Sequence, residues 1–214
     1  MKASRVIALG CFWLYVVLFP GSTLTLALGQ VPAWGAGMGG LLLLIQGLAA
    51  AAWLVWAYGR RGALAGLGTL GLAWACEHIG ETSGWPFGRY EYTSILAPQI
   101  AGVVPLPIVC AWLMVALGAW QLAGRLARGT GKSARGIAIA GTATLILVLD
   151  LQIETIATRV NTYWRWIDHG PYYGVPTTNF IAWWLVGLLM ATVLMYALWG
   201  VQSPMPASER AGWR

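Results

Sequence analysis

The stretch from Trp34 to Glu81, WGAGMGGLLLLIQGLAAAAWLVWAYGRRGALAGLGTLGLAWACEHIGE, contains two long apolar runs with Arg60 and Arg61 between them. Each run is close to the ~20 residues that an α-helix needs to cross the hydrocarbon core of a bilayer. A pair of arginines in a short connection is typical of the cytoplasmic side of a membrane protein. The stretch therefore predicts two consecutive transmembrane helices joined on that side.

Apolar runs of similar length recur through the whole chain of 214 residues, of which 58% are hydrophobic and 9% are charged. Because an ordinary soluble domain carries roughly 25% charged residues, this composition excludes that class. We predict an all-α fold, a polytopic transmembrane helix bundle of about six spans, in a single integral-membrane domain that covers residues 1–214. The predicted spans are Arg5–Leu28, Trp34–Tyr58, Ala63–Glu81, Val103–Leu126, Gly136–Ile156 and Asn179–Gly200, and a short tail follows at residues 201–214.

The formal charge of +6 comes from basic residues in the connections between the spans. This pattern orients membrane helices, so we expect a lipid bilayer and no nucleic acid as the partner of these cations. We predict a location in the cell inner membrane with cytoplasmic N- and C-termini. In this orientation all lysines and arginines lie on the cytoplasmic side except Arg89, Arg159 and Arg165. A cleaved signal peptide is an alternative for the first segment, but the charge bias is stronger when that segment is kept as a span.

Paired carboxylates close two of the predicted spans. Glu77 and Glu81 end the third span, and Asp150 and Glu154 end the fifth. Residues four apart share a helix face, so each pair faces in one direction. A charged side chain near the bilayer centre costs roughly 2.5–3.5 kcal/mol, and carboxylates inside membranes therefore point to function. We predict that the two pairs meet in one pocket at the non-cytoplasmic end, where like charges favour the neutral, proton-donating form of at least one carboxyl.

A long loop rich in Gly, Pro and aromatic residues follows each acidic pair. We expect such apolar loops to pack over the bundle and cap a cavity on its non-cytoplasmic side, where aromatic faces can stabilise a cation. The order of paired acid and then aromatic loop occurs twice, as a faint repeat. The loops also carry Glu91 and Asp168, for which an ion pair with an arginine that merely anchors the loop is an equally good interpretation.

A metal or haem site is not expected. The only histidines, His78 and His169, are too few for a di-iron site, and one of them lies in a predicted loop. Cys11, Cys76 and Cys110 are isolated in apolar sequence, which is typical of small core residues. The sequence therefore predicts chemistry without a metal or other cofactor.

Three strings resemble the CruF-type carotenoid hydratases, a family of membrane proteins of carotenoid biosynthesis. They are ETSGWPFGRYEYT at 81–93, GVVPLPIVCAW at 102–112 and YWRWIDHGPYYGVPTTNFIAWW at 163–184. The resemblance covers about Glu77–Trp112 and Leu147–Trp184, whereas the first two spans agree only in hydropathy. It implies addition of water to the terminal 1′,2′ double bond of a linear carotenoid ψ-end group, which gives a tertiary alcohol.

The resemblance also defines the candidate site. Protonation of a trisubstituted alkene gives a tertiary cation, and a carboxylate can take the proton of the water that adds to it. We expect the four paired acids to be catalytic, with Glu81 and Asp150 the most consequential. The residues expected to contact a lycopene- or γ-carotene-like substrate are His78, Trp85, Phe87, Arg89, Tyr90, Tyr92, Trp166, Asp168, Tyr172, Tyr173 and Asn179.

Three other functions stay open at this point. A carotenoid cyclase protonates the same end group and then closes a ring. A transporter or proton channel also uses membrane acids, although it would distribute them through the depth of the bilayer. The third is a carotenoid-binding or assembly subunit that works with other enzymes of carotenoid biosynthesis.

Overall fold

The computed structural model describes residues 2–30, 32, 35, 37–127 and 131–201. The predicted start of the second span at Trp34 and nearly all of the predicted tail lie outside these residues. Five long helices make up most of the described chain. They are α1 (Lys2–Ala27), α2 (Met38–Ser83), α3 (Leu106–Leu126), α4 (Lys132–Arg159) and α5 (Thr177–Leu198).

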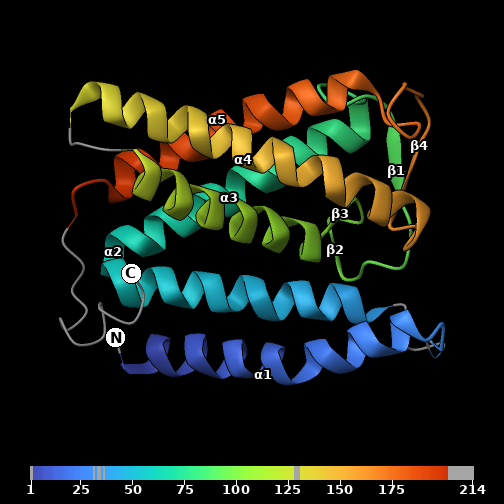
Figure 1. Cartoon of the computed structure of the whole chain (residues 1–214), viewed down its shortest axis with the longest axis horizontal. Helices are drawn as coiled ribbons and strands as arrows, with labels where there is room; N and C mark the ends of the chain where they lie inside the picture. Colours follow the sequence, from blue (N-terminus) through green and yellow to red (C-terminus); the bar gives the residue numbers. More distant parts are fainter. Residues whose placement is uncertain (1, 31, 33–34, 36, 128–130, 202–214) are drawn as a thin grey trace.

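All five helices are long and apolar enough to cross a membrane. Helix α2 has 46 residues, and a straight helix of that length would extend about 69 Å, more than twice the thickness of a hydrocarbon core. Its helical geometry breaks at Gly59, and Figure 1 shows α2 turning back on itself there. With α2 counted as a first arm (residues 38–58) and a second arm (residues 60–83), the predicted bundle of about six spans is confirmed.

Two glycines make the turn inside α2 possible. Gly59 has φ 58° and ψ −134°, a backbone conformation that residues with a side chain rarely adopt. Gly62 lies so close to the first arm that a Cβ atom there would overlap the carbonyl oxygen of Leu54. The predicted connection around Arg60 and Arg61 is therefore a tight reversal rather than a separate loop.

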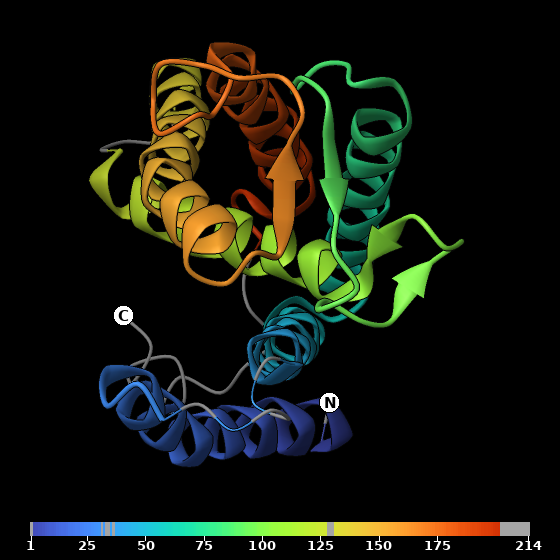
Figure 2. The same ribbon diagram turned by 90° about the vertical axis from the view of Figure 1, so that its right-hand side faces the viewer.

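The second arm of α2 and helices α3, α4 and α5 form a group around the main core, whereas α1 lies beside the first arm of α2 (Figures 1 and 2). The core contains Trp112 and Leu113 of α3, Ile146 of α4 and Leu194 of α5, all of them buried. Helix α1 buries only Ala8 within the described part of the chain.

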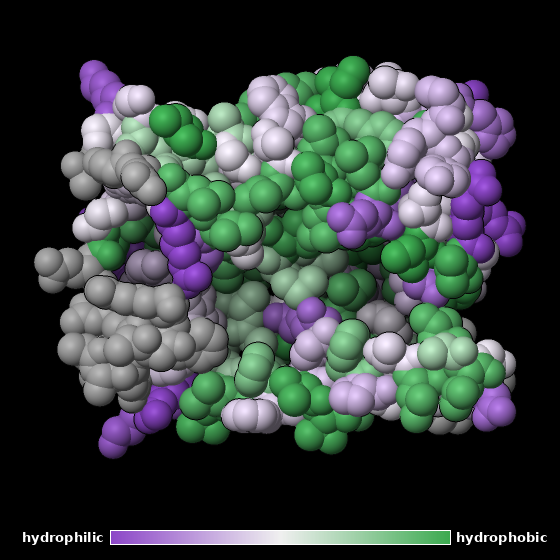
Figure 3. All heavy atoms as spheres, viewed as in Figure 1, coloured by the Kyte–Doolittle hydropathy of each residue, from purple (hydrophilic) through white to green (hydrophobic). Residues whose placement is uncertain are grey.

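Polar and apolar residues are separated along the bundle axis. Hydrophobic residues cover much of the middle of the face in Figure 3, and hydrophilic residues lie mainly toward its two ends. The start of α1, the turn of α2 and the start of α4 carry basic residues and lie at one end. The last turns of α2 and α4, which hold the paired acids, lie at the opposite end, as the sequence predicted.

Short strands close the acidic end of the bundle. Strand β1 (Tyr90–Tyr92) pairs antiparallel with β4 (Trp164–Trp166), so that the two aromatic loops form one ribbon (Figure 2). Strands β2 (Gln99–Ile100) and β3 (Val104–Pro105) form a second antiparallel pair just before α3. The prediction that two loops rich in aromatic residues cap the bundle is confirmed.

Candidate active site

The ribbon of β1 and β4 presents aromatic rings to the bundle. Side chains alternate between the two faces of a strand, so the sequences Tyr-Glu-Tyr and Trp-Arg-Trp each direct two rings inward. Glu91 and Arg165 pair in the register and are exposed on the outer face. The inward rings that line the cavity beneath are Tyr90, Tyr92, Trp164 and Trp166.

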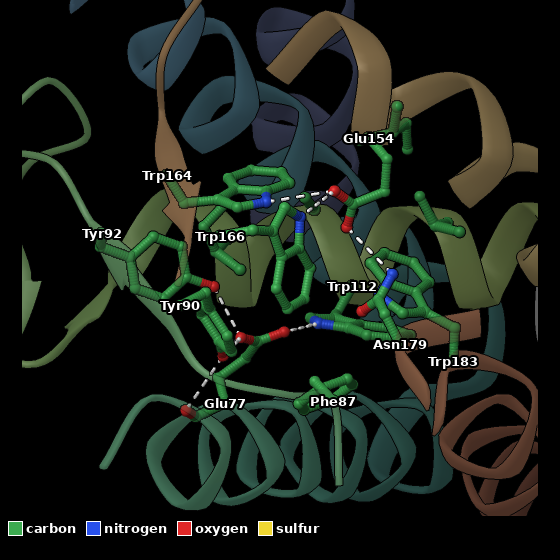
Figure 4. A pocket seen from close by; sticks show the side chains of 14 residues that line it. Glu77, Phe87, Tyr90, Tyr92, Trp112, Glu154, Trp164, Trp166, Asn179 and Trp183 are labelled. Atoms are coloured by element: carbon green, nitrogen blue, oxygen red, sulfur yellow. Dashed lines mark hydrogen bonds between the residues drawn. The ribbon is translucent and has the colours of Figure 1, made fainter. Parts of the chain in front are cut away.

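Glu77 of α2 is buried beneath this ribbon and accepts three hydrogen bonds (Figure 4). The hydroxyls of Tyr90 and Tyr92 donate to Oε2 over 2.7 and 2.6 Å, and the indole Nε1 of Trp112 donates to Oε1 over 2.6 Å. Burial, and then the nearby charge of Glu77, raises the pKa of both tyrosines, so the phenols stay protonated and donate. Glu77 therefore has the surroundings of a carboxylate that acts only as an acceptor.

Glu154 of α4 has a matching set of donors. Trp164 and Trp166 donate their indole Nε1 atoms to Oε2 over 3.3 and 2.9 Å, and the amide Nδ2 of Asn179 donates to Oε1 over 3.1 Å. The same amide nitrogen donates to Oδ2 of Asp150 over 3.1 Å. Asp150 and Glu154 are both almost fully buried. Asn179 thus holds two carboxyl groups that lie one helical turn apart.

Glu77 and Glu154 line the same cavity, which has a volume of ≈ 60 Å³ (Figure 4). Helix α3 lines the cavity with a stripe at 108, 111, 112 and 115, and Ile153 and Trp183 complete its apolar wall. The rings of Trp112 and Trp183 stack with their centroids 4.0 Å apart. No lysine, arginine or histidine is present among the described residues that line the cavity. Two buried carboxyl groups and many aromatic faces create an environment that favours a positive charge.

Several of the predicted site residues line this cavity. Besides the two glutamates, they are Phe87, Tyr90, Tyr92, Trp166 and Asn179. Gly80 leaves room for two of them, because a Cβ atom at this position would lie 2.5 Å from Cδ2 of Phe87 and 2.9 Å from the hydroxyl of Tyr90. The close approach of α2 to its own loop therefore positions the hydroxyl that binds Glu77.

Other predicted site residues lie outside the cavity lining. Asp150 lies behind Glu154, and Glu81 is only partly buried at the end of α2, near Glu91 and His78. His78 stacks on Trp74 with a centroid distance of 5.3 Å and is not among the residues that line the cavity. Glu81 and Glu77 share one side of α2, but the rotation of the helix brings only Glu77 under the ribbon.

The aromatic residues Trp85, Tyr172 and Tyr173 are also outside the lining. Trp85 and Tyr173 are 71% and 57% exposed. Tyr172 donates its hydroxyl hydrogen to the carbonyl oxygen of Leu151 over 2.9 Å, which ties the second loop to α4. The structure therefore gives these three residues no contact with the cavity.

Arg89 and Asp168 join the two loops to each other. The guanidinium Nη2 lies 2.9 Å from Oδ1 of Asp168, and the Arg89 backbone N–H donates to Oδ2 over 2.9 Å. The hydrogen bonds from Arg89 hold the pKa of Asp168 below its ordinary value. Both groups are exposed and outside the cavity lining, so for this pair the geometry matches the loop-anchoring interpretation.

Three lining tryptophans were not among the substrate-contacting residues predicted from the sequence: Trp112, Trp164 and Trp183. Trp164 could have been identified from the alternation of Trp-Arg-Trp, since the prediction already included Trp166. Trp112 and Trp183 occupy positions within membrane helices, where an aromatic residue is usually lipid-facing or core. No group of three or more metal-ligating side chains occurs within the described residues.

Comparison with known proteins gives the same assignment as the strings in the two loops. Residues 38–212 match the family model described as "Carotenoid biosynthesis protein". The chain is also 28% identical over 129 residues to bisanhydrobacterioruberin hydratase from Haloarcula japonica. That match covers 60% of this chain and 43% of the relative, so the chain corresponds to less than half of the relative's length. No solved structure matches the chain.

The family match begins at the first residue of α2 and includes every element that lines the cavity, whereas α1 lies outside it. The paired acids, the two aromatic strands and the helices that follow them are thus all within the matched region. The chain belongs to the carotenoid biosynthesis protein family.

Proposed function

We propose that this protein adds water to the terminal double bond of a linear carotenoid ψ-end group and forms a tertiary alcohol. The observation that carries the proposal is the placement of two buried glutamates from different helices on one small aromatic cavity. The hydratase activity named for the Haloarcula relative agrees with this reaction.

The size of the cavity favours chemistry on an end group. A volume of ≈ 60 Å³ accommodates a few small groups or water molecules, but not a long polyene. We therefore place only the branched end of the substrate between Glu77 and Glu154, and the rest of the polyene outside the cavity in contact with apolar surface or lipid.

The reaction needs one acid and one base. The acid transfers a proton to the less substituted alkene carbon, which leaves a tertiary cation at the other carbon. The faces of Trp112, Trp166 and Trp183 and the negative carboxylates favour this cation over the neutral substrate. The oxygen of water then bonds to the cation, and the base takes the released proton. Glu77 and Glu154 supply the two roles without a cofactor.

Expression in a lycopene-producing host tests the proposal. The expected product is a carotenoid that has gained one molecule of water at one or both ends, with its oxygen derived from labelled water. Activity should survive chelators and the removal of dioxygen, because neither a metal nor dioxygen takes part. A cyclised product with no added water would instead identify a cyclase, and oxygen from dioxygen would refute hydration.

We also propose a location in the cell inner membrane, with cytoplasmic termini and the cavity toward the opposite side. The basic end of the bundle carries both the start of α1 and the turn of α2, in agreement with the positive-inside rule. Reporter fusions at Gly131 and Gly170 should then report opposite sides of the membrane. The carotenoid substrate and neighbouring enzymes of its synthesis would be the partners in that membrane.

A further inference from the structure

The cavity is built from two copies of one structural unit. In each copy, a helix with a buried glutamate near its C-terminal end is followed by strand β1 or β4 and then by a helix that begins after a Val-Pro pair. An Ala-Trp pair ends seven positions beyond each proline. The motifs are Val104-Pro105 with Ala111-Trp112 in the first copy and Val175-Pro176 with Ala182-Trp183 in the second. The two equivalent tryptophans stack on each other, and the two strands pair antiparallel.

The hydrogen bonds follow the same repeat. Each glutamate accepts two donors from alternate residues of the strand in its own copy. A third donor comes from the following helix, namely Trp112 for Glu77 and Asn179 for Glu154. The two glutamates are therefore equivalent in position and in number of donors (Figure 4).

The copies differ at two buried positions next to the glutamates. Four residues before the glutamate, the first copy has Ala73 and the second has Asp150. Three residues after the helix-starting proline, the first copy has Ile108 and the second has Asn179. The second copy alone thus contains an additional buried carboxyl group and an amide that donates to both buried carboxyls, whereas Glu81 of the first copy is only partly buried.

This difference decides where a proton can be held. Asp150 is completely buried, accepts the amide of Asn179 at Oδ2, and its Oδ1 has no hydrogen-bond partner among the described residues. The ionisable groups around it and Glu154 are Glu77 from α2 and the phenols of β1, none of which is a cation. Burying two neighbouring anions without a cation is strongly unfavourable, so the pair retains one proton that belongs to both carboxyls.

We infer that Asp150, Asn179 and Glu154 form the proton-donating side of the site, and that Glu77 is the carboxylate that receives the proton of water. This assignment rests on the proposed hydration and adds the direction of proton flow to it. Glu154 touches the substrate cavity and is the catalytic acid, whereas Asp150 is a positioning residue that keeps a proton on the pair. Glu77 has no second buried carboxyl on its own helix, because Glu81 is only partly buried, so Glu77 is the base.

The steps balance for protons and electrons. The alkene π electrons form a C–H bond with the proton of the pair, whose O–H bond breaks and leaves the pair doubly negative. The water oxygen forms the C–O bond with the cation, and its surplus proton passes to Glu77. Movement of that proton from Glu77 back to Glu154 through water in the cavity restores the starting state, with one water consumed per alcohol formed.

Infrared spectroscopy of the purified, detergent-solubilised protein tests the inference without a carotenoid. Protonated carboxyl groups have a C=O stretching band that ionised carboxylates lack and that shifts in heavy water. We expect this band in the wild-type protein near neutral pH, its loss in Asp150→Asn, and its retention in Glu77→Gln. Absence of the band from the wild type, or its loss in Glu77→Gln but not in Asp150→Asn, would overturn the assignment.

Isotope labelling provides a second measurement that needs no variant. Asp150 and Asp168 are the only aspartates of the chain, and Asp168 is exposed and paired with Arg89. Carbon-13 in the side-chain carboxyl of aspartate should therefore shift the band through Asp150, and the same label in glutamate should shift it through Glu154. A band that neither label shifts would refute the inference.

In the product assay, Asp150→Asn should lower kcat by about 10²-fold with little change in KM, since general acid catalysis typically contributes 10²–10⁴-fold. A protein that shows the band but forms no alcohol would refute the proposed function and leave the proton pair intact.

Discussion

Replacing Glu77 by glutamine should damage both catalysis and stability, and the structure indicates how much. Glutamine keeps the shape of the side chain but has one acceptor oxygen and one amide donor. The tyrosine hydroxyls can rotate and keep the oxygen as partner, whereas the rigid indole of Trp112 would then face the amide nitrogen. One buried donor loses its acceptor at a cost of about 1–3 kcal/mol, and two charge-assisted hydrogen bonds weaken by about 1 kcal/mol each.

The expected loss is therefore about 3–5 kcal/mol of unfolding free energy, a large part of the ~5–15 kcal/mol of an ordinary domain. The rate of alcohol formation should fall by about 10²–10⁴-fold per molecule of folded protein, because the base is gone. Product should be measured in the carotenoid-producing host and normalised to the amount of protein in the membrane, and the thermal midpoint should be measured in detergent.

Glu91→Gln is the matched control. Glu91 also belongs to the acidic end, but it lies on the exposed outer face of β1 opposite Arg165, where such a pair contributes little. We expect less than a ten-fold change in rate and a stability change within about 0.5 kcal/mol. Equal losses of rate in the two variants at equal protein levels would refute the placement of the chemistry in the cavity.

Three further outcomes follow from the fold and the loops. Gly62→Ala should strongly reduce the amount of folded protein, because its Cβ atom would overlap the other arm of α2, whereas Gly71→Ala in the same arm meets open space and should be tolerated when both are compared by gel filtration. Glu81→Gln should lower the rate of product formation less than Glu77→Gln, since its side chain is outside the cavity lining. The hydrogen bonds of Arg89 lower the pKa of Asp168, so the stability from this contact is present above the ordinary carboxyl pKa of about 3.9 and is lost as pH falls below it. Asp168→Asn should therefore lower the thermal midpoint slightly at neutral pH and leave it nearly unchanged once the pH is low enough to protonate Asp168, so that the midpoint depends less on pH in the acid range.

The spans were predictable because each depends on one local property, a long apolar run bounded by charge or by Gly and Pro. The same reasoning predicted a loop at Arg60 and Arg61, although the structure continues as helix on either side of Gly59. Hydropathy does not distinguish these two connections, because the difference lies in the positive φ of one glycine. The close packing at Gly62 depends on the position of the first arm, and no local sequence pattern indicates it.

The ranking of the acids required information that the sequence lacks. Residues four apart on a helix differ by about 40° in direction and about 6 Å along the axis, so Glu77 and Glu81 have the same periodicity signal. Which of them enters the cavity depends on how α2 packs against its loop at Gly80, where Phe87 and Tyr90 approach closely. The pairing of β1 with β4 could not be predicted either. Each strand has only three residues, and so short an alternation of side chains does not specify a partner strand far away in the sequence.

The two copies of the repeat differ at two buried positions beside the glutamates, and the proposed reaction gives a reason for that difference. Two identical halves would give each glutamate the same donors and the same tendency to ionise, and neither would be suited to give a proton while the other accepts one. The proposed hydration requires that difference, because one carboxyl would give a proton and the other would accept one. Asp150 and Asn179 introduce it on one side only, whereas the other side has Ala73 and Ile108 at these positions and no second buried carboxyl. In the proposed hydration, these two buried residues would thus set the direction of proton transfer, within a frame of aromatic donors that is common to both halves.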